Sequence, residues 1–145
     1  MPLKNILVLC QGNICRSPMA EAILIRAMPT VNVHSAGLGA MVGWAADPTA
    51  ILLMKLRGID ISPHIAKQLS FQMAREAEII LTMNYRQKDE VVARYSFTRG
   101  RVFSLGERKN IEIVDPYQKD RKFFEQALSE IDIGVDSWLP VLKKI

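Results

Sequence analysis

Short apolar runs alternate along this chain with segments in which apolar residues recur at helical spacing. The apolar runs predict four β-strands, which we place at Lys4–Leu9, Val31–Ser35, Glu78–Thr82 and Arg101–Leu105. Three of these runs are mostly apolar, as expected for strands that are buried on both faces. Val31–Ser35 instead alternates between apolar and polar residues. We therefore expect this strand nearer to an edge of the sheet.

The intervening segments predict helices at Pro18–Met28, Pro48–Arg57, Ser70–Ala77, Asn84–Tyr95 and Arg121–Lys144. Asp47 is the expected N-cap of the second helix, because Pro48 follows it at the first helical position. Gly58 supplies the stop signal of the same helix. In the last helix, Gly134 and Pro140 are expected to cause a bend or an early end.

Strands that alternate with helices predict the α/β class. We expect a single three-layer domain over residues 1–145, with a four-stranded parallel sheet and helices on both of its faces. No linker, repeat or low-complexity segment interrupts the 145 residues. In such folds, ligands bind beyond the carboxyl ends of the strands. Cys10 follows the first predicted strand and is therefore expected at the binding edge.

The composition is that of a globular protein, with 49% hydrophobic and 23% charged residues. No stretch approaches the ~18 apolar residues of a membrane span, and the N-terminus lacks the architecture of a signal peptide. We therefore expect a cytoplasmic protein without membrane insertion, whose two cysteines are free thiols. The net charge of +4 suits an anionic substrate. Lys and Arg are scattered, so no nucleic-acid partner is expected.

The segment from Cys10 to Ser17 joins the first predicted strand to the first predicted helix, and Pro18 follows it. A loop that opens onto a helix N-terminus directs several backbone N–H groups at one spot, which suits phosphate. The spacing Cys-x5-Arg-Ser is the pattern of cysteine-dependent phosphatases. A single buried cysteine is more often a small hydrophobic residue. The strand before this motif and the helix after it favour a phosphate-binding loop.

The residue types of this loop fit nucleophilic catalysis. A thiol has an ordinary pKa of about 8.5, so the Cys10 thiolate needs stabilisation from the loop N–H groups, the helix dipole and Arg16. Arg16 can also bind two phosphoryl oxygens. Gly12 allows close backbone approach and a positive φ, and Asn13 tolerates the left-handed conformation. The reaction would proceed through a phosphocysteine that water hydrolyses.

The leaving group of such a reaction needs a proton, and Asp115 in Asp115-Pro116-Tyr117 is the best candidate for the general acid. The alternative is an ordinary Asp-Pro turn, as at Asp47-Pro48. Asp47 is a weaker candidate because its position fits N-capping better. No metal or other cofactor is expected, since His34 and His64 have no metal-ligand spacing with the cysteines.

The stretch from Cys10 to Pro18, together with Asp115-Pro116-Tyr117, resembles the low-molecular-weight protein-tyrosine phosphatase family over essentially the whole chain. His34–Gly37 and Ser62–Gln68 also resemble family segments. The resemblance implies Cys10 as nucleophile, Arg16 as phosphate clamp and Asp115 as general acid. It also implies a phosphate-binding loop formed by Gln11, Gly12, Asn13, Ile14, Cys15 and Ser17. In that loop Ser17 would assist the thiolate.

Outside the loop, the resemblance implies that Ser35 and His64 join Asn13 in a network that supports it. Without the family, His64 would be interpreted as a surface histidine. Tyr117 would form a wall of the substrate cleft, and the alternative for it is a packed loop tyrosine. The animal branch of the family has an aromatic residue in the opposite wall, where we place Ala40 or Met41. Trp44 lies nearby in the sequence, and Gln118 replaces a second tyrosine.

The segment Ser35–Ala50 is similar to the bacterial branch that is encoded with exopolysaccharide or capsule machinery. Members of that branch act on tyrosine autokinases. The resemblance therefore implies a phosphotyrosine protein as partner, with the C-terminal tyrosine-rich segment of such a kinase as the site of action. We expect the enzyme to be a monomer or a weak dimer.

Three alternatives share parts of the pattern. Thioredoxin-coupled arsenate reductases carry a similar loop but need further cysteines, and this chain has only Cys10 and Cys15. Phosphoarginine phosphatases typically have threonine at the position of Ile14, whose apolar side chain suits an aryl ring better. Phosphocysteine carriers of sugar phosphotransferase systems lack the loop arginine and need no general acid.

Cys15 also suggests redox control. An activated Cys10 that is oxidised to a sulfenic acid could be captured by Cys15 in a disulfide, before irreversible oxidation. The alternative is that Cys15 is simply a packed loop residue.

Overall fold

The computed structural model describes residues 2–145. Its centre is a parallel sheet of β1 (Asn5–Cys10), β2 (Asn32–Gly37), β3 (Ile79–Thr82) and β4 (Val102–Ser104). The strand order is β2-β1-β3-β4. Val8 of β1 pairs with Ser35 on one side and Leu81 on the other. The predicted α/β fold and parallel sheet are thus confirmed, and the alternating strand β2 lies at an edge as expected.

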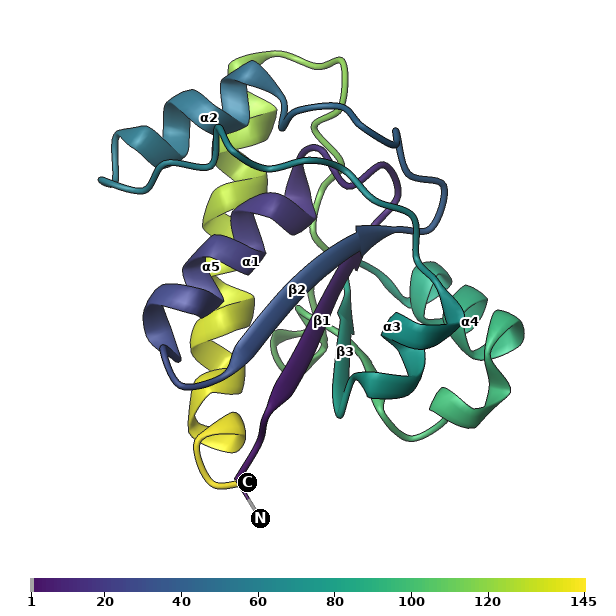
Figure 1. Ribbon diagram of the computed structural model, residues 1–145. Helices are drawn as coiled ribbons and strands as arrows, with labels where there is room; N and C mark the ends of the chain where they lie inside the picture. Colours follow the sequence, from purple (N-terminus) through teal and green to yellow (C-terminus); the bar gives the residue numbers. More distant parts are fainter. Residues whose placement is uncertain (1) are drawn as a thin grey trace.

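Helices cover both faces of the sheet (Figure 1). They are α1 (Arg16–Ala27), α2 (Pro48–Lys55), α3 (Phe71–Glu76), α4 (Tyr85–Arg94) and α5 (Arg121–Leu142), with short 3-10 turns η1 at Ser96–Thr98 and η2 at Glu107–Lys109. The helices α1 and α5 pack together on one face, with α2 against α5. The helices α3 and α4 cover the other face (Figure 1).

The central position of β1 explains why its sequence shows no alternation of apolar and polar residues. Ile6 and Val8 enter the larger core, beneath α1 and α5. Leu7 and Leu9 enter a second core on the side of α3 and α4. Because successive side chains point to opposite faces, a strand between two helical layers needs apolar residues at every position.

Most helix ends lie one or two residues from their predicted positions. α1 begins at Arg16 rather than Pro18, because proline is tolerated in the first turn of a helix. α2 ends at Lys55 rather than Arg57, and Gly58 follows with φ of +78°. Asp47 is the N-cap of α2 as predicted, since its carboxylate accepts a hydrogen bond from the Thr49 N–H at 2.9 Å.

The last helix, α5, ends at Leu142 rather than at the predicted Lys144, with Pro140 inside its final turn. Gly134 lies in the middle of this helix and serves packing. A Cβ atom at Gly134 would lie 2.7 Å from Leu105 Cγ, so any side chain there would push α5 away from β4 and its following turn.

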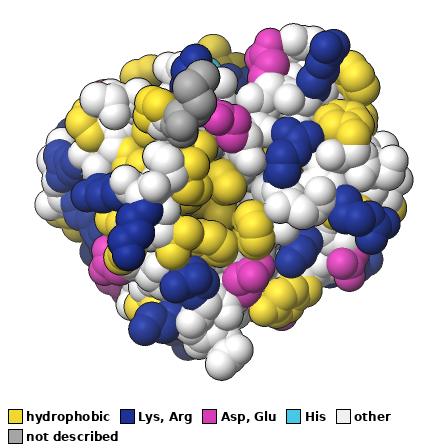
Figure 2. All heavy atoms as spheres, turned by 90° about the horizontal axis from the view of Figure 1, so that it is seen from below, with side chains coloured by type: hydrophobic (Ala, Val, Ile, Leu, Met, Phe, Trp, Pro, Cys, Tyr) yellow, Lys and Arg dark blue, Asp and Glu magenta, His cyan; other side chains and the backbone are white. Residues whose placement is uncertain are grey.

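The two ends of the sheet differ in character. At the amino end of the strands, where both chain termini lie (Figure 1), apolar side chains such as Leu3, Met28 and Val31 line a hollow of about 250 Å³. Figure 2 shows that the Lys and Arg side chains on this face are dispersed among acidic and uncharged ones. Within residues 2–145, no helix is long and apolar enough to cross a membrane. The Cys10 loop lies at the opposite, carboxyl end.

Candidate active site

The loop between β1 and α1 holds the predicted nucleophile. Cys10 is the last residue of β1, and its side chain is 3% exposed. Its Sγ lies 2.9 Å from the Oγ of Ser17, in the first turn of α1. The same Oγ accepts a hydrogen bond from Asn13 Nδ2 at 2.8 Å. The Ser17 hydroxyl proton is therefore free to point at the sulfur, where it stabilises a thiolate.

Asn13 organises the loop from inside. It has a φ of +60° and is fully buried. Its Nδ2 also donates to Ser35 Oγ at 3.0 Å, and its Oδ1 accepts from the Lys67 N–H at 3.0 Å. The His64 ring contacts the Asn13 carbonyl through Nε2 at 2.7 Å, which makes Nε2 the donor. The structure thus brings together Asn13, Ser17, Ser35 and His64, as the resemblance implies.

Gly12 behaves differently from the expectation. Its φ does not lie in the positive region, and Asn13 supplies the left-handed turn of the loop instead. A Cβ atom at Gly12 would lie 3.5 Å from Met41 Cγ, which is ordinary van der Waals contact. Asparagine tolerates the left-handed conformation at small cost and also contributes the polar side chain that the network needs.

Glu21 is a member of this network that the sequence analysis missed. Its Oε1 accepts a hydrogen bond from Ser35 Oγ at 2.9 Å and lies 3.8 Å from His64 Nδ1. Glu21 follows Ser17 by one helical turn on α1, so the two side chains lie on the same face of the helix. The four-residue spacing between Ser17 and Glu21 is therefore the sequence feature that could have predicted this role of Glu21. Glu21 thus anchors two groups that support the loop.

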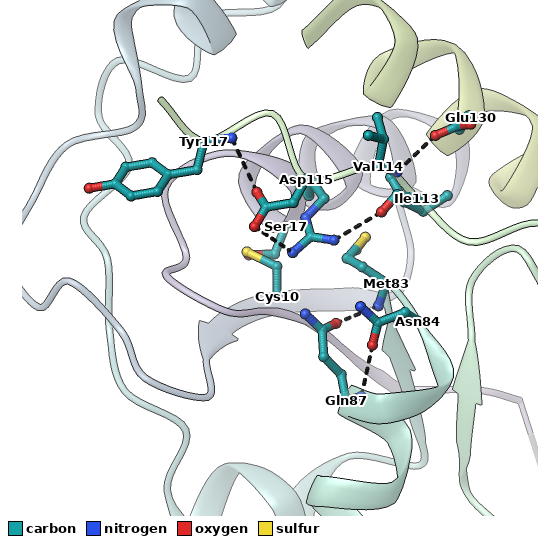
Figure 3. A network of polar contacts seen from close by, with 11 residues as sticks. Cys10, Ser17, Met83, Asn84, Gln87, Ile113, Val114, Asp115, Tyr117 and Glu130 are labelled. Atoms are coloured by element: carbon teal, nitrogen blue, oxygen red, sulfur yellow. Dashed lines mark hydrogen bonds and ion pairs between the residues drawn. The ribbon is translucent and has the colours of Figure 1, made fainter. Parts of the chain in front are cut away.

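Arg16 and Asp115 meet across the cleft. Figure 3 shows the Asp115 side chain beside that of Tyr117. The Arg16 side chain is 4% exposed, and its Nη2 lies 3.6 Å from Asp115 Oδ2. Its Nη1 donates to the Ile113 carbonyl at 2.9 Å. The side chain of Asp115 is 52% exposed, and its Oδ1 accepts from the Tyr117 N–H at 3.2 Å. Asp115 therefore faces Arg16 with Oδ2, while Oδ1 stabilises the Asp115–Tyr117 turn by accepting from the Tyr117 N–H.

The cleft above Cys10 has a volume of about 180 Å³. Its apolar walls include Ile14, Met41 and Tyr117, and its polar rim includes Gln11 and Asp115. Gly39, rather than the predicted Ala40, lines the cleft beside Met41. Ala40 does not line it, and its backbone N–H donates to Gln68 Oε1 at 2.8 Å.

The comparison with protein families decides the identity of this site. The sequence model described as "Low molecular weight phosphotyrosine protein phosphatase" matches residues 5–145. The chain belongs to the low-molecular-weight phosphotyrosine protein phosphatase family. The prediction from the Cys10 loop is therefore confirmed, and the chain is a protein-tyrosine phosphatase.

Two relatives of this phosphatase match over nearly their whole length. The chain is 49% identical to "Probable low molecular weight protein-tyrosine-phosphatase EpsP" of Ralstonia solanacearum, over 99% of both chains. It is 41% identical to "Low molecular weight protein-tyrosine-phosphatase Wzb" of Escherichia coli K12, over 95% of both chains.

Solved structures agree with the fold of the phosphatase. The tyrosine phosphatase AmsI of Erwinia amylovora superimposes with a TM-score of 0.92 at 38% identity, covering 97% of this chain and 93% of AmsI. The arginine phosphatase YwlE of Geobacillus stearothermophilus superimposes with a TM-score of 0.90 at 31% identity, covering 97% and 94%. Backbone shape alone therefore does not separate the two substrate classes.

Two further residues of the phosphatase differ in their relation to the cleft. Trp44 is 55% exposed and does not line it. Cys15 does line it, is 4% exposed, and is a free thiol like Cys10. Burial raises the pKa of the Cys15 thiol, and the carboxylate of Asp47 acts in the same direction. Cys15 is therefore held protonated at neutral pH.

No group of three or more metal-ligating side chains that could hold an ion occurs in the part of the chain that the structure describes. The phosphatase instead offers N–H donors at the start of α1 and the guanidinium of Arg16, and both favour an anion.

Proposed function

We propose that this phosphatase hydrolyses phosphotyrosine in proteins through a phosphocysteine on Cys10. The contact between Cys10 Sγ and Ser17 Oγ, in the same cleft as Arg16 and Asp115, carries the proposal. The Cys10 thiolate attacks phosphorus, and an S–P bond forms. The bond from phosphorus to the tyrosine oxygen breaks, and its electron pair stays on that oxygen.

Asp115 protonates the departing tyrosine oxygen in the first step. Its Oδ2 faces the loop, and the Tyr117 N–H holds its Oδ1 in place. In the second step, the Asp115 carboxylate takes a proton from water while that water attacks phosphorus. The S–P bond then breaks, phosphate leaves, and the electron pair returns to the Cys10 thiolate.

Arg16 clamps the phosphoryl group in both steps. Its planar guanidinium donates two parallel hydrogen bonds to phosphoryl oxygens, with a geometry that suits the transition state. Its anchor on the Ile113 carbonyl fixes the plane of the group before substrate binds. The loop N–H groups at the N-terminus of α1 supply the remaining donors.

The walls of the cleft favour an aryl phosphate over phosphoarginine. Ile14, Met41 and Tyr117 present apolar surface to the cleft. A phenyl ring fits between such walls with its flat faces covered. A guanidinium would lose hydration there without gaining acceptors from these side chains.

We propose a physiological substrate from the resemblance to exopolysaccharide-associated phosphatases. The similarity to EpsP, Wzb and AmsI over almost the whole chain supports this proposal. The substrate is the C-terminal tyrosine-rich segment of a tyrosine autokinase, which the enzyme meets in the cytoplasm. The whole chain acts as a single domain, as a monomer or a weak dimer.

The test compares hydrolysis of phosphotyrosine, phosphoserine and phosphoarginine peptides with arsenate reduction, in wild type and Cys10→Ser. We expect turnover of phosphotyrosine alone, survival of activity in a chelator, and a phosphorylated Cys10 after rapid acid quench. A Cys10→Ser variant that retains even a tenth of wild-type turnover would contradict the phosphocysteine mechanism. Preferred turnover of phosphoarginine would assign the chain the chemistry of YwlE instead.

A further inference from the structure

A second, larger groove adjoins the catalytic cleft. It has a volume of about 730 Å³ and shares Gln11, Arg16 and Asp115 with the cleft. Its floor is the first turn of α4, with Asn84, Arg86 and Gln87. The mechanism proposed above uses none of these three residues. A polypeptide whose phosphotyrosine occupies the cleft can place an adjacent residue in this groove.

The carboxamides of Asn84 and Gln87 have a fixed orientation. Asn84 Oδ1 accepts from the Gln87 N–H at 2.8 Å, which makes Asn84 the N-cap of α4. Gln87 Oε1 accepts from the Met83 N–H at 2.8 Å. In a carboxamide only the oxygen can accept a hydrogen bond from a backbone N–H. Exchanging the oxygen and nitrogen positions of either side chain would therefore break its bond. Both side-chain nitrogens are therefore turned away from the backbone.

These nitrogens are donors without acceptors. Across residues 2–145, neither Asn84 Nδ2 nor Gln87 Nε2 has a hydrogen-bond partner, although Gln87 is only 5% exposed. Figure 3 shows the Gln87 carboxamide extending from α4 toward the side of the groove that holds Cys10. Among residues 2–145 only Ser104 Oγ is a buried side-chain N or O atom without a hydrogen-bond partner, so the Gln87 Nε2 atom is open to the groove and can donate to a ligand there.

Arg86 adds a charge beside these donors. Its side chain is exposed, lines the groove, and forms no ion pair with any residue from 2 to 145. The N-terminus of the ten-residue helix α4 contributes a further positive potential at the same place. The Arg86 guanidinium, the donor ends of the two oriented amides and the helix N-terminus, which Asn84 caps, therefore all favour an anion here.

The acidic residues of the groove are already engaged. Glu90 pairs with Arg94, which lies one turn further along α4. Glu112 Oε2 accepts from the Tyr85 N–H at 2.8 Å, and Glu130 Oε1 accepts from the Val114 N–H at 2.8 Å. Asp115, the fourth carboxylate of the groove, pairs with Arg16. The bonds of Glu112 and Glu130 to backbone N–H groups leave their negative charges in place, whereas Arg86 has no acidic partner within residues 2–145.

We propose that Arg86, with Asn84 and Gln87, forms a specificity subsite for a second anionic group close to the phosphotyrosine of a substrate. The ligand chemistry is a carboxylate or a second phosphotyrosine, both of which accept several hydrogen bonds. This inference rests on the proposed function. It explains how one cleft distinguishes a clustered tyrosine segment from an isolated phosphotyrosine.

The test measures kcat/KM for peptides of one scaffold with a single phosphotyrosine. The flanking positions on either side carry Glu, Gln or Lys in turn, and a further peptide carries a second phosphotyrosine. In wild type, the best Glu peptide should exceed its Gln counterpart by about fivefold at low ionic strength, and the preference should shrink in high salt. The response to Glu and to the second phosphotyrosine tells the two anion sources apart.

The decisive variant is Arg86→Glu, with Arg99→Glu as its matched control. Arg99 is exposed, does not line the groove, and produces the same change in net charge. Each peptide rate is divided by the rate on nitrophenyl phosphate, which cannot reach the groove, so that a general loss of activity cancels. Arg86→Glu should abolish or reverse the preference for an anion, while Arg99→Glu should keep it.

Two results would overturn the subsite. The first is equal rates on all single-phosphotyrosine and double-phosphotyrosine peptides in wild type. The second is an equal loss of preference in Arg86→Glu and Arg99→Glu, because this would indicate long-range steering by net charge. In both cases phosphotyrosine is still hydrolysed and the proposed function stands. Failure to hydrolyse any phosphotyrosyl peptide would overturn the proposed function and the subsite together.

Discussion

The guanidinium of Arg16 lies 3.6 Å from the carboxylate of Asp115, so the phosphate clamp and the proposed general acid are paired across the cleft. A phosphoryl group that enters the cleft competes with Asp115 for the same N–H donors. The hydrogen bond of Arg16 to the Ile113 carbonyl uses Nη1, a different nitrogen from the Nη2 that faces Asp115, so the exchange does not require it to break. Asp115 is half exposed and lies on a loop, so it can turn toward the leaving-group oxygen as Arg16 takes hold of phosphate.

Replacing Asp115 by Asn should slow hydrolysis most for substrates with poor leaving groups. Proton donation contributes about 10²–10⁴-fold when the departing oxygen is basic, and less for nitrophenolate. The measurement is kcat for a series of aryl phosphates of increasing leaving-group pKa. We expect a steeper dependence on this pKa in Asp115→Asn than in wild type. Equal slowing across the series would make Asp115 a structural residue.

Replacing Arg16 by Lys should lower kcat by about 10²–10³-fold, although the charge is kept. An ammonium group cannot bind two phosphoryl oxygens and the Ile113 carbonyl in one plane. The matched control is Arg57→Lys, because Arg57 also forms a two-bond pair with a carboxylate, that of Asp132 on the surface. Arg57→Lys should retain wild-type kcat, and a comparable loss in both variants would contradict a role for the Arg16 fork.

Two substitutions separate the backbone and side-chain roles of Asn13. Asn13→Gly keeps the left-handed turn but removes the amide, whereas Asn13→Ala also introduces backbone strain. Loss of the amide leaves the buried hydroxyls of Ser17 and Ser35 and the part-buried Lys67 N–H each short of a bond. Urea unfolding of Asn13→Gly should therefore show a loss of about 1–3 kcal/mol. Asn13→Ala should lose more. Wild-type kcat in Asn13→Gly would show that the network does not position Cys10.

The stability of the fold should fall at alkaline pH because of Cys15. Burial raises the folded-state pKa of this thiol above the unfolded value of about 8.5. The contribution of the buried Cys15 thiol to stability is therefore fully present below about pH 8.5. It is lost as the pH rises from there toward the folded-state pKa. The slope approaches about 1.4 kcal/mol per pH unit. Denaturant unfolding between pH 7 and 10 should show this slope in wild type and not in Cys15→Ala.

Mild peroxide should inactivate the enzyme reversibly through a Cys10–Cys15 disulfide. Peroxide converts Cys10 to a sulfenic acid with release of water, and attack by Cys15 on that sulfur expels a second water as the S–S bond forms. The raised pKa of Cys15 slows this capture, so protection from overoxidation should improve as the pH rises. Thiol counts and recovery in reductant measure the effect. Equal recovery in Cys15→Ser would leave Cys15 without a protective role.

The local features of this protein could be predicted from its sequence because short-range physics determines them. The apolar runs mark strands that are buried on both faces, and Asp47-Pro48 marks a helix start that the structure reproduces. The spacing from Cys10 to Ser17 places a thiol and a helix N-terminus within one loop. The residues that carry this chemistry lie within the loop at a fixed spacing, so the chemistry was recognisable without tertiary structure.

Other features depend on segments that are distant in the sequence and meet only in the fold. The 3.6 Å approach of Asp115 to Arg16 requires the loop after β4 to return over β1. The contact of Glu21 with His64, and the place of Gly39 rather than Ala40 in the cleft, depend on how separate loops pack at the carboxyl edge of the sheet. The sequence predicted only a bend or an early helix end at Gly134, and its packing role depends on Leu105 of another segment, which excludes a side chain there. Packing between distant segments, which no local pattern encodes, decided these features.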